Sequence, residues 1–225
     1  MLSDKQILEI REHLEKAQNP VFFFDNDQDG LCSFLLLQKS LEKGKGVPIR
    51  SFPSLDREYF RKVSEFNSDY IFILDKPIVS EQFFEEAEKL NLPVVWIDHH
   101  EIPDLKIPEF VNYYNPLFSG DKTNEPITNI CYRISKRKED LWLAVAGCIA
   151  DKFLPEFYED FKKAFPDMCV NGEIDDAFKV LYDSQIGKIS RMFGFGLKDR
   201  TTNVIQMLKF LIKAKSPYDV IEESK

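Results

Sequence analysis

The stretch 22-FFFDNDQDGLCSFLLL-37 combines three acidic residues with an apolar run on each side. Asp25, Asp27 and Asp29 stand at every second position, after three phenylalanines and before Gly30. Carboxylates this close repel one another, and burying them without a counter-charge costs several kcal/mol each. The stretch therefore predicts a positive group among the aspartates: a metal ion, a basic partner or a helix N-terminus.

Apolar runs of strand length alternate with helical patterns around this stretch. The expected strands are residues 21–24, 47–52, 70–74 and 93–97, and the expected helices are residues 3–18, 31–43, 56–66 and 80–90. Continuous apolar strands separated by helices are typical of a parallel sheet that is covered on both faces. We therefore expect an α/β fold with a parallel, Rossmann-like sheet flanked by helices.

Acidic residues follow three of the expected strands directly. Asp25, Asp75 and Asp98 each stand at the carboxyl end of an apolar run. Ligands of open α/β sheets bind outside the carboxyl ends of the strands. We expect these three side chains to meet on one rim of the sheet.

Beyond residue 110 the pattern changes to helices. A last strand is expected near residues 110–115, and helices at residues 128–134, 140–149, 156–165, 173–183 and 201–214. Residues 187–200 are rich in glycine and cationic side chains, and Gly194-Phe195-Gly196 within them favours a helix-packing turn.

The bulk composition is that of an ordinary globular protein. The 225 residues are 44% hydrophobic and 30% charged. The net charge of −8 argues against a surface that is basic overall and binds nucleic acid through most of its area. The four cysteines have no paired spacing, so neither a zinc site nor a disulfide framework is indicated. No apolar run has the length of a membrane span, and the first residues form a charged amphipathic segment rather than a signal peptide. We expect a cytoplasmic protein that contacts no membrane.

The DNDQDG segment has two other interpretations. A D-x-D-x-D-G sequence also begins the calcium loop of helix-loop-helix proteins, but that loop needs a glutamate in twelfth place, where Leu36 stands, and a preceding helix. The acids could instead cap the helix that begins near Leu31. Capping is sufficient for Asp29 but leaves Asp25 and Asp27 unexplained.

Two later segments carry further candidates for a metal site. Asp98-His99-His100 places two of the three histidines of the chain at the end of an expected strand. Neutral imidazole is the commonest metal ligand in proteins, and a neighbouring aspartate can orient it. The apolar helix that ends in Gly147-Cys-Ile-Ala-Asp151 delivers a further acid, which is costly there unless a cation meets it.

Taken in order, DNDQDG, the Asp75 of YIFILDK, IDHH and GCIAD resemble the four motifs of the DHH phosphoesterase superfamily. This superfamily includes RecJ-type single-strand exonucleases, nanoRNases and cyclic-dinucleotide phosphodiesterases, and family II pyrophosphatases. The resemblance covers about residues 20–155. It implies a DHH domain over residues 1–155 and a helical extension over residues 156–225, leading toward a missing C-terminal substrate-binding domain, since no Gly-Gly-Gly-His motif occurs in the chain.

The resemblance also implies a role for each motif residue. Two ions, Mn²⁺ or Mg²⁺, are expected in the site, and mixed oxygen and imidazole ligands suit Mn²⁺. Such a pair of ions would cancel the carboxylate repulsion and promote an in-line displacement at phosphorus. His100 would face the substrate phosphate, with Asp98 beside it as a further catalytic residue. The implied ligands are Asp27, Asp75, His99 and Asp151 for one ion, and Asp25 and Asp75 for the other.

The chain departs from the superfamily before the first motif. Many members carry a histidine there, whereas this chain has phenylalanines at residues 22–24. We expect one ion to bind tightly and the second only weakly. Four cationic side chains are expected to bind substrate: Lys76, Lys152, Arg191 and Arg200.

The function implied by the resemblance is metal-dependent hydrolysis of phosphodiester bonds. The expected substrates are single-stranded nucleic acid or short oligonucleotides, and the expected partners include replication or repair proteins. One alternative is a phosphoesterase for cyclic dinucleotides or pyrophosphate. The other is a non-catalytic DHH scaffold in a replication complex, similar to a eukaryotic replicative-helicase component, although the intact motif residues favour catalysis.

Overall fold

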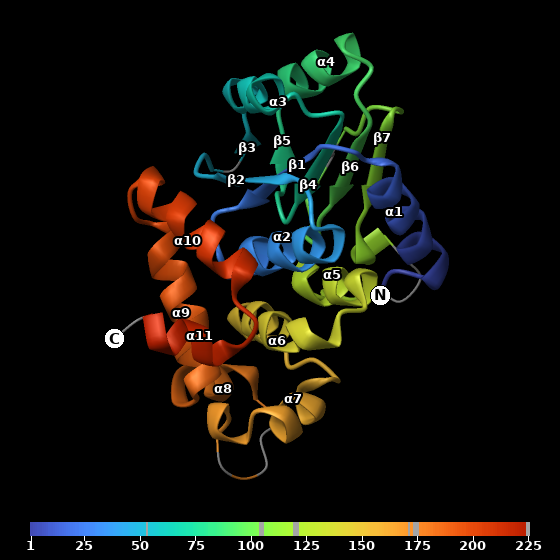
Figure 1. Ribbon diagram of the computed structural model, residues 1–225. Coiled ribbons are helices and arrows are strands. Elements are labelled where there is room, and N and C mark those ends of the chain that lie inside the picture. The colour runs from blue at the N-terminus through green and yellow to red at the C-terminus, as the bar shows by residue number, and fades with distance from the viewer. Residues whose placement is uncertain (53, 104–105, 119–121, 171, 173–175, 224–225) are drawn as a thin grey trace.

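The computed structural model describes residues 1–52, 54–103, 106–118, 122–170, 172 and 176–223 (Figure 1). Its centre is a sheet of five parallel strands in the order β2-β1-β4-β6-β7. The strands are β1 (Pro20–Asp25), β2 (Lys45–Ile49), β4 (Tyr70–Leu74), β6 (Val94–Ile97) and β7 (Val111–Tyr114). The predicted parallel α/β fold is confirmed. A small second sheet, β3 (Ser54–Leu55) with β5 (Ile78–Val79), was not predicted from the sequence.

Helices cover both faces of the large sheet. On one face lie α3 (Arg61–Phe66) and α4 (Glu81–Lys89), and on the other lie α1 (Asp4–Lys16), α2 (Gln28–Leu41), α5 (Ile127–Ser135) and α6 (Leu141–Ala150) (Figure 1). Successive residues of β1 supply the two cores in turn, because side chains of a strand alternate between its faces. Phe22 and Phe24 belong to the core beneath α2, and Val21 and Phe23 to the core beneath α4.

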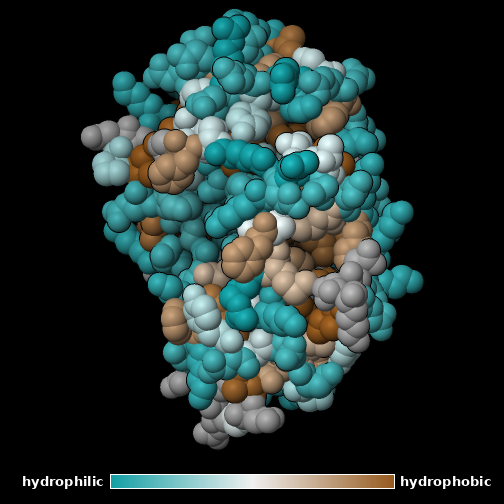
Figure 2. Space-filling model, turned by 90° about the vertical axis from the view of Figure 1, so that its left-hand side faces the viewer, coloured by the Kyte–Doolittle hydropathy of each residue, from teal (hydrophilic) through white to brown (hydrophobic). Residues whose placement is uncertain are grey.

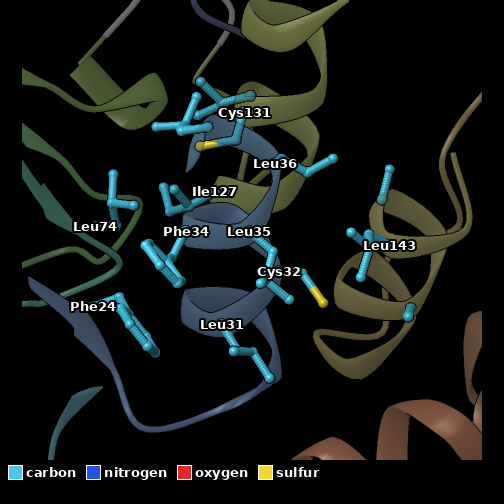
Figure 3. Close-up of a cluster of buried hydrophobic side chains, with 14 of the residues drawn as sticks. Phe24, Leu31, Cys32, Phe34, Leu35, Leu36, Leu74, Ile127, Cys131 and Leu143 are labelled. Atoms are coloured by element: carbon cyan, nitrogen blue, oxygen red, sulfur yellow. The ribbon is translucent and has the colours of Figure 1, made fainter. Parts of the chain in front are cut away.

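Helix α2 is the centre of the larger core. Its Phe34 stacks on Phe24 of β1, while Cys32 of α2 points toward Leu143 of α6 (Figure 3). A helix that is apolar on almost every side must be surrounded, and the sheet, α5 and α6 do this for α2. Its N-terminus is therefore held firmly at the rim of the sheet.

The C-terminal helices extend the same core. They are α7 (Tyr158–Ala164), α8 (Ala177–Asp183), α9 (Gln185–Leu197), α10 (Thr201–Lys213) and α11 (Pro217–Glu223). Buried side chains of α9, among them Ile189 and Phe193, belong to the cluster that also contains α2 and α6. Residues beyond 155 thus complete the packing around the N-terminal part.

The glycine-rich segment in this region differs from its prediction. Residues 194–196 were expected to form a turn, but they lie inside the helix α9. A Cβ atom on Gly194 would lie 2.7 Å from Nε2 of Gln28 at the start of α2, and one on Gly196 would lie 2.5 Å from Sδ of Met207. Glycine at these two positions leaves room for the side chains of Gln28 and Met207, although it has a low helix propensity.

The surface on the side of α9 to α11 is mainly hydrophilic. Hydrophobic side chains gather around a hollow in the middle of this face (Figure 2). Among the described residues, α9 and α10 expose Phe195 and Ile205. None of the described helices has the length and apolar character that crossing a bilayer requires.

Candidate metal centre

The three aspartates of the first motif lie at the end of β1, in the short loop that follows it and in the first turn of α2. Asp27 is the N-cap of α2, and its Oδ1 accepts a hydrogen bond of 2.9 Å from the backbone N–H of Gly30. A side chain at residue 30 is excluded, because a Cβ there would lie 2.4 Å from the backbone oxygen of Asp25. Gly30 therefore allows the helix to start directly beside the end of β1.

Asp29 connects the first motif to a distant helix. The sequence suggested that Asp29 caps the helix of its own segment, but Asp27 does so. The fully buried carboxylate of Asp29 instead accepts hydrogen bonds from the backbone N–H groups of Ile127, at 2.8 Å, and Thr128, at 2.7 Å. These groups belong to the first turn of α5, where a carboxylate is stabilised by unpaired N–H donors.

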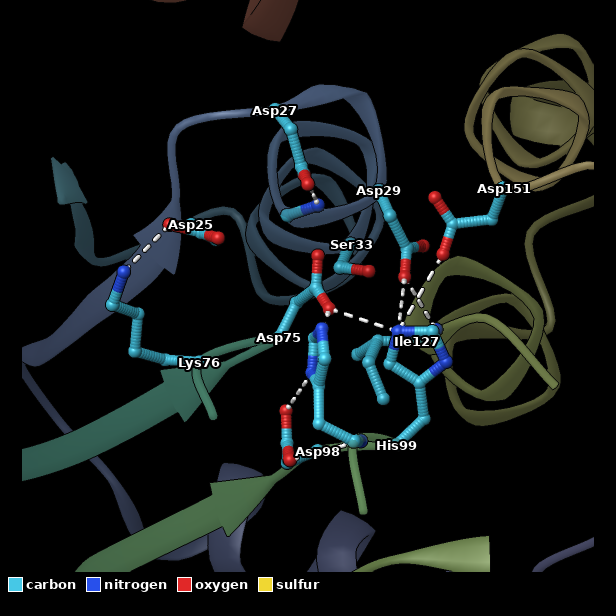
Figure 4. Close-up of polar contacts among 12 residues, drawn as sticks. Asp25, Asp27, Asp29, Ser33, Asp75, Lys76, Asp98, His99, Ile127 and Asp151 are labelled. Atoms are coloured by element: carbon cyan, nitrogen blue, oxygen red, sulfur yellow. Dashed lines mark hydrogen bonds and ion pairs between the residues drawn. The ribbon is translucent and has the colours of Figure 1, made fainter. Parts of the chain in front are cut away.

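Asp75 follows β4 directly and has an unusual backbone conformation. Its φ of 57° lies in the left-handed region, which is uncommon for a residue with a side chain and is concentrated at functional sites. Its backbone N–H still donates to the carbonyl of Ile97, at 2.9 Å, so the sheet continues to this residue. After this turn, the buried carboxylate of Asp75 points toward His99, whereas the next side chain, Lys76, points toward Asp25 (Figure 4).

Three carboxylates converge on one nitrogen of His99 (Figure 4). Nε2 of His99 lies 3.3 Å from Oδ1 of Asp75, 3.5 Å from Oδ2 of Asp151 and 3.9 Å from Oδ2 of Asp29. Oδ1 of Asp75 is buried and has no hydrogen-bond partner among the described residues. Two groups that share His99, Asp75-His99-His100 and Asp29-His99-Asp151, each have ligand atoms within 4.8 Å of one another, and their oxygen and imidazole donors suit a divalent cation.

The electrostatics of the cluster also favour a cation. Burial raises the pKa of Asp29 to about 7 and the pKa values of Asp27 and Asp151 to about 6, and neighbouring carboxylates add to each shift. Burial and the same neighbours raise the pKa of Asp75. Burial lowers the pKa of His99, which keeps its imidazole neutral and able to act as a ligand. The residues present therefore fit a divalent ion.

His100, the residue after His99, lines the same pocket. Its Nδ1 lies 2.9 Å from Oδ1 of the buried Asp98, and its backbone N–H donates to Oδ2 of Asp98 at 3.0 Å. The hydrogen bond that His100 donates to Asp98 raises the pKa of His100, whose side chain is 41% exposed. This imidazole can thus offer a proton or a positive charge to a group that enters the pocket.

The pocket itself has a volume of about 520 Å³. The sequence indicated only a capping role for Asp29, and no motif marked Glu101, Leu117 and Asn124 as part of the wall. The lining residues are Asp27, Asp75, His99, His100, Glu101, Leu117, Asn124 and Asp151.

The remaining predicted residues lie elsewhere. Lys76, expected to contact substrate, is fully buried and forms an ion pair with Asp25, expected to bind a metal. Arg191 donates to the carbonyl of Leu181 and covers the ring of Tyr182, so it joins α9 to α8. Lys152, next to Asp151, and Arg200, at the start of α10, are exposed and do not line the pocket.

The fold and this site define an α/β domain with acidic and imidazole ligands at the carboxyl rim of a parallel sheet. The family model described as "DHH family, N-terminal domain" matches residues 21–150. The chain belongs to the DHH family.

Three solved structures have a similar fold over 98% of this chain. RecJ from Thermus thermophilus, in complex with Mn²⁺, is 16% identical with a TM-score of 0.55, and another exonuclease RecJ, bound to manganese, is 16% identical with a TM-score of 0.59. The DHH domain of a member of a family of ribosomal proteins is 17% identical with a TM-score of 0.61. The chain spans 38%, 67% and 60% of these three structures, respectively. A comparison with curated protein sequences found no match.

The raised pKa values predict how pH and metal change stability. Carboxyl groups with a raised pKa hold more protons in the folded protein than in the unfolded chain, so the metal-free protein should lose stability as pH rises from about 4 to about 7. A bound divalent ion should reverse this loss, because it binds the deprotonated groups. Thermal unfolding should show a larger increase in Tm on adding Mn²⁺ at about pH 7.5 than at about pH 5.5. An equal increase at both values would contradict the cluster as the binding site.

Proposed function

We propose that this chain is a divalent-metal-dependent phosphodiesterase that hydrolyses single-stranded nucleic acid or short oligonucleotides. The observation that carries the proposal is the convergence of Asp29, Asp75 and Asp151 on Nε2 of His99, in a pocket that also holds His100. Membership of the DHH family supports phosphoester chemistry at this pocket. Mn²⁺ is the proposed ion, with Mg²⁺ as the alternative.

Each residue of the pocket has a place in this chemistry. Asp29, Asp75, His99 and Asp151 would hold the ion, which supplies charge neutralisation at the phosphate and a lowered pKa for an attacking water. His100 donates a hydrogen bond to a phosphate oxygen as negative charge develops there. Asp98 fixes the orientation of the His100 ring and favours its protonated form. The exposed Lys152 adds positive charge close to the pocket.

An exposed aromatic side chain beside the site supports an oligomeric substrate. Phe52 is 85% exposed, and the centroid of its ring lies 5.9 Å from Nζ of Lys76, which is itself paired with Asp25 at the rim. Proteins that bind single strands stack bases on such side chains, at about 1–3 kcal/mol per base. Phe52 is therefore the proposed platform for a base next to the scissile phosphate.

Substrate class can be tested by comparing wild type with Phe52→Ala. The wild-type protein with Mn²⁺ is expected to shorten labelled single-stranded oligonucleotides. Addition of EDTA should stop this hydrolysis. Loss of one stacked base predicts that Phe52→Ala raises KM for oligonucleotides about 5- to 100-fold. The rate with bis(p-nitrophenyl) phosphate, which offers no base to stack, should change little. Phe195→Ala, which removes another exposed phenylalanine on α9, serves as the control.

The same assay separates the other functions. Hydrolysis of pyrophosphate or cyclic dinucleotides in preference to oligonucleotides would replace the proposed substrate class. Binding of single-stranded nucleic acid without hydrolysis by the metal-loaded protein would instead identify a scaffold and overturn the proposal.

A further inference from the structure

The ion pair of Lys76 and Asp25 lies beside the metal cluster, and it occupies a carboxylate that was expected to bind the second ion. Nζ of Lys76 lies 2.8 Å from Oδ1 of Asp25 and 2.8 Å from the backbone oxygen of Ser51. The Lys76 side chain is 0% exposed, whereas that of Asp25 is 21% exposed. Figure 4 shows this pair at the end of β1, apart from the group formed by Asp29, Asp75, His99 and Asp151.

The ammonium group is held in place by its surroundings. The backbone oxygen of Lys76 accepts a hydrogen bond of 2.8 Å from Nε1 of the buried Trp96. The preceding residue, Asp75, has the left-handed backbone that turns the chain away from the cluster. Lys76 is therefore held both at its backbone and at its ammonium group. Moving the ammonium group away from Asp25 would break buried hydrogen bonds, and an unsatisfied buried donor or acceptor costs free energy.

A fixed cation at this position determines what else Asp25 can bind. A divalent ion bridging Asp25 and Asp75 would bring its two charges close to a buried ammonium group, and such repulsion is strong where water is excluded. We propose that the ammonium group of Lys76 takes the place of a second metal ion, so that the site holds one tightly bound divalent ion. Asp25 then serves as the partner of Lys76 rather than as a metal ligand. This inference rests on the metal site of the proposed function.

The number of bound ions tests the inference without an activity assay. Calorimetric titration of the metal-free protein with Mn²⁺ should give one tight site in wild type. Lys76→Met keeps the apolar stem and removes the charge, which frees Asp25, so this variant should bind a second ion. The double variant Lys76→Met/Asp25→Asn removes both members of the pair and should return to one site.

A further variant keeps the test decisive if Lys76→Met does not fold. Asp25→Asn retains a hydrogen-bond acceptor for Lys76 and should bind one ion with a dissociation constant within about threefold of wild type, since it removes no ligand. A loss of tenfold or more in affinity would overturn the inference, as would two equally tight sites in wild type or a single site in folded Lys76→Met. One tight site without hydrolysis would leave the inference intact and contradict the proposed phosphodiesterase.

Discussion

Replacing Asp75 with asparagine is expected to abolish Mn²⁺-dependent hydrolysis and to weaken Mn²⁺ binding on the order of 100-fold or more. Asp75 is almost fully buried, and its Oδ1 lies 3.3 Å from Nε2 of His99 with no hydrogen bond of its own among the described residues. Asparagine keeps the shape but removes the charge, so the ion loses a buried anionic ligand. Calorimetry with Mn²⁺ measures the loss of affinity directly.

The same substitution should stabilise the metal-free protein. Asp75 is buried among Asp27, Asp29 and Asp151, whose charges raise its pKa in addition to burial, and an asparagine removes this repulsion. The free energy of unfolding near pH 7.5, in EDTA, should therefore rise, which distinguishes a ligand from a residue that only supports the fold. Asp160→Asn, the same change at an exposed site on α7, is the control and should alter neither property. Retention of tight Mn²⁺ binding by Asp75→Asn would remove Asp75 from the site.

Two substitutions of Asp29 should separate its two roles. Asp29→Ala leaves the buried N–H groups of Ile127 and Thr128 without their acceptor, whereas Asp29→Asn retains an amide oxygen for one of them. We expect Asp29→Ala to be about 2 kcal/mol less stable than Asp29→Asn in the absence of metal, from the cost of an unpaired buried donor. Denaturant unfolding of the two variants measures this difference.

Both Asp29 variants should lose at least about tenfold in Mn²⁺ affinity, because each removes a carboxylate oxygen from the cluster. Equal stability of the two variants would show that the hydrogen bonds to α5 contribute little. Unchanged Mn²⁺ affinity in both would show that Asp29 only anchors α5, and that the ion is held without it.

The fold was predictable because its strands are continuous apolar runs. Buried on both faces, β1, β4 and β6 contain no alternating polar residues, and this pattern specifies a parallel sheet. The same geometry explains why Asp75 and His99, 24 positions apart, could be expected on one rim. Neighbouring strands of a parallel sheet end close together. Because β4 pairs with β6, the residues that follow these two strands are neighbours.

The roles of Asp29 and Lys76 could not be predicted in the same way. The spacing of the first motif indicates that Asp29 lies at the start of a helix. It does not indicate that the N-terminus of α5, 98 positions later in the sequence, packs against Asp29. The sequence around a lysine that follows a metal ligand does not show whether that lysine is exposed or buried. The ion pair between Lys76 and Asp25 depends on the backbone turn at Asp75. The helix α9 was missed because its glycines have low helix propensity, and their value lies in contacts with Gln28 and Met207.

The most direct measurement is an anomalous difference map from crystals of the protein soaked in Mn²⁺. We expect one strong peak at bonding distance from carboxylate oxygens of Asp29, Asp75 and Asp151 and from Nε2 of His99. A pocket without a peak, or a peak bound to Asp25 and Asp27 and not to His99, would contradict this expectation.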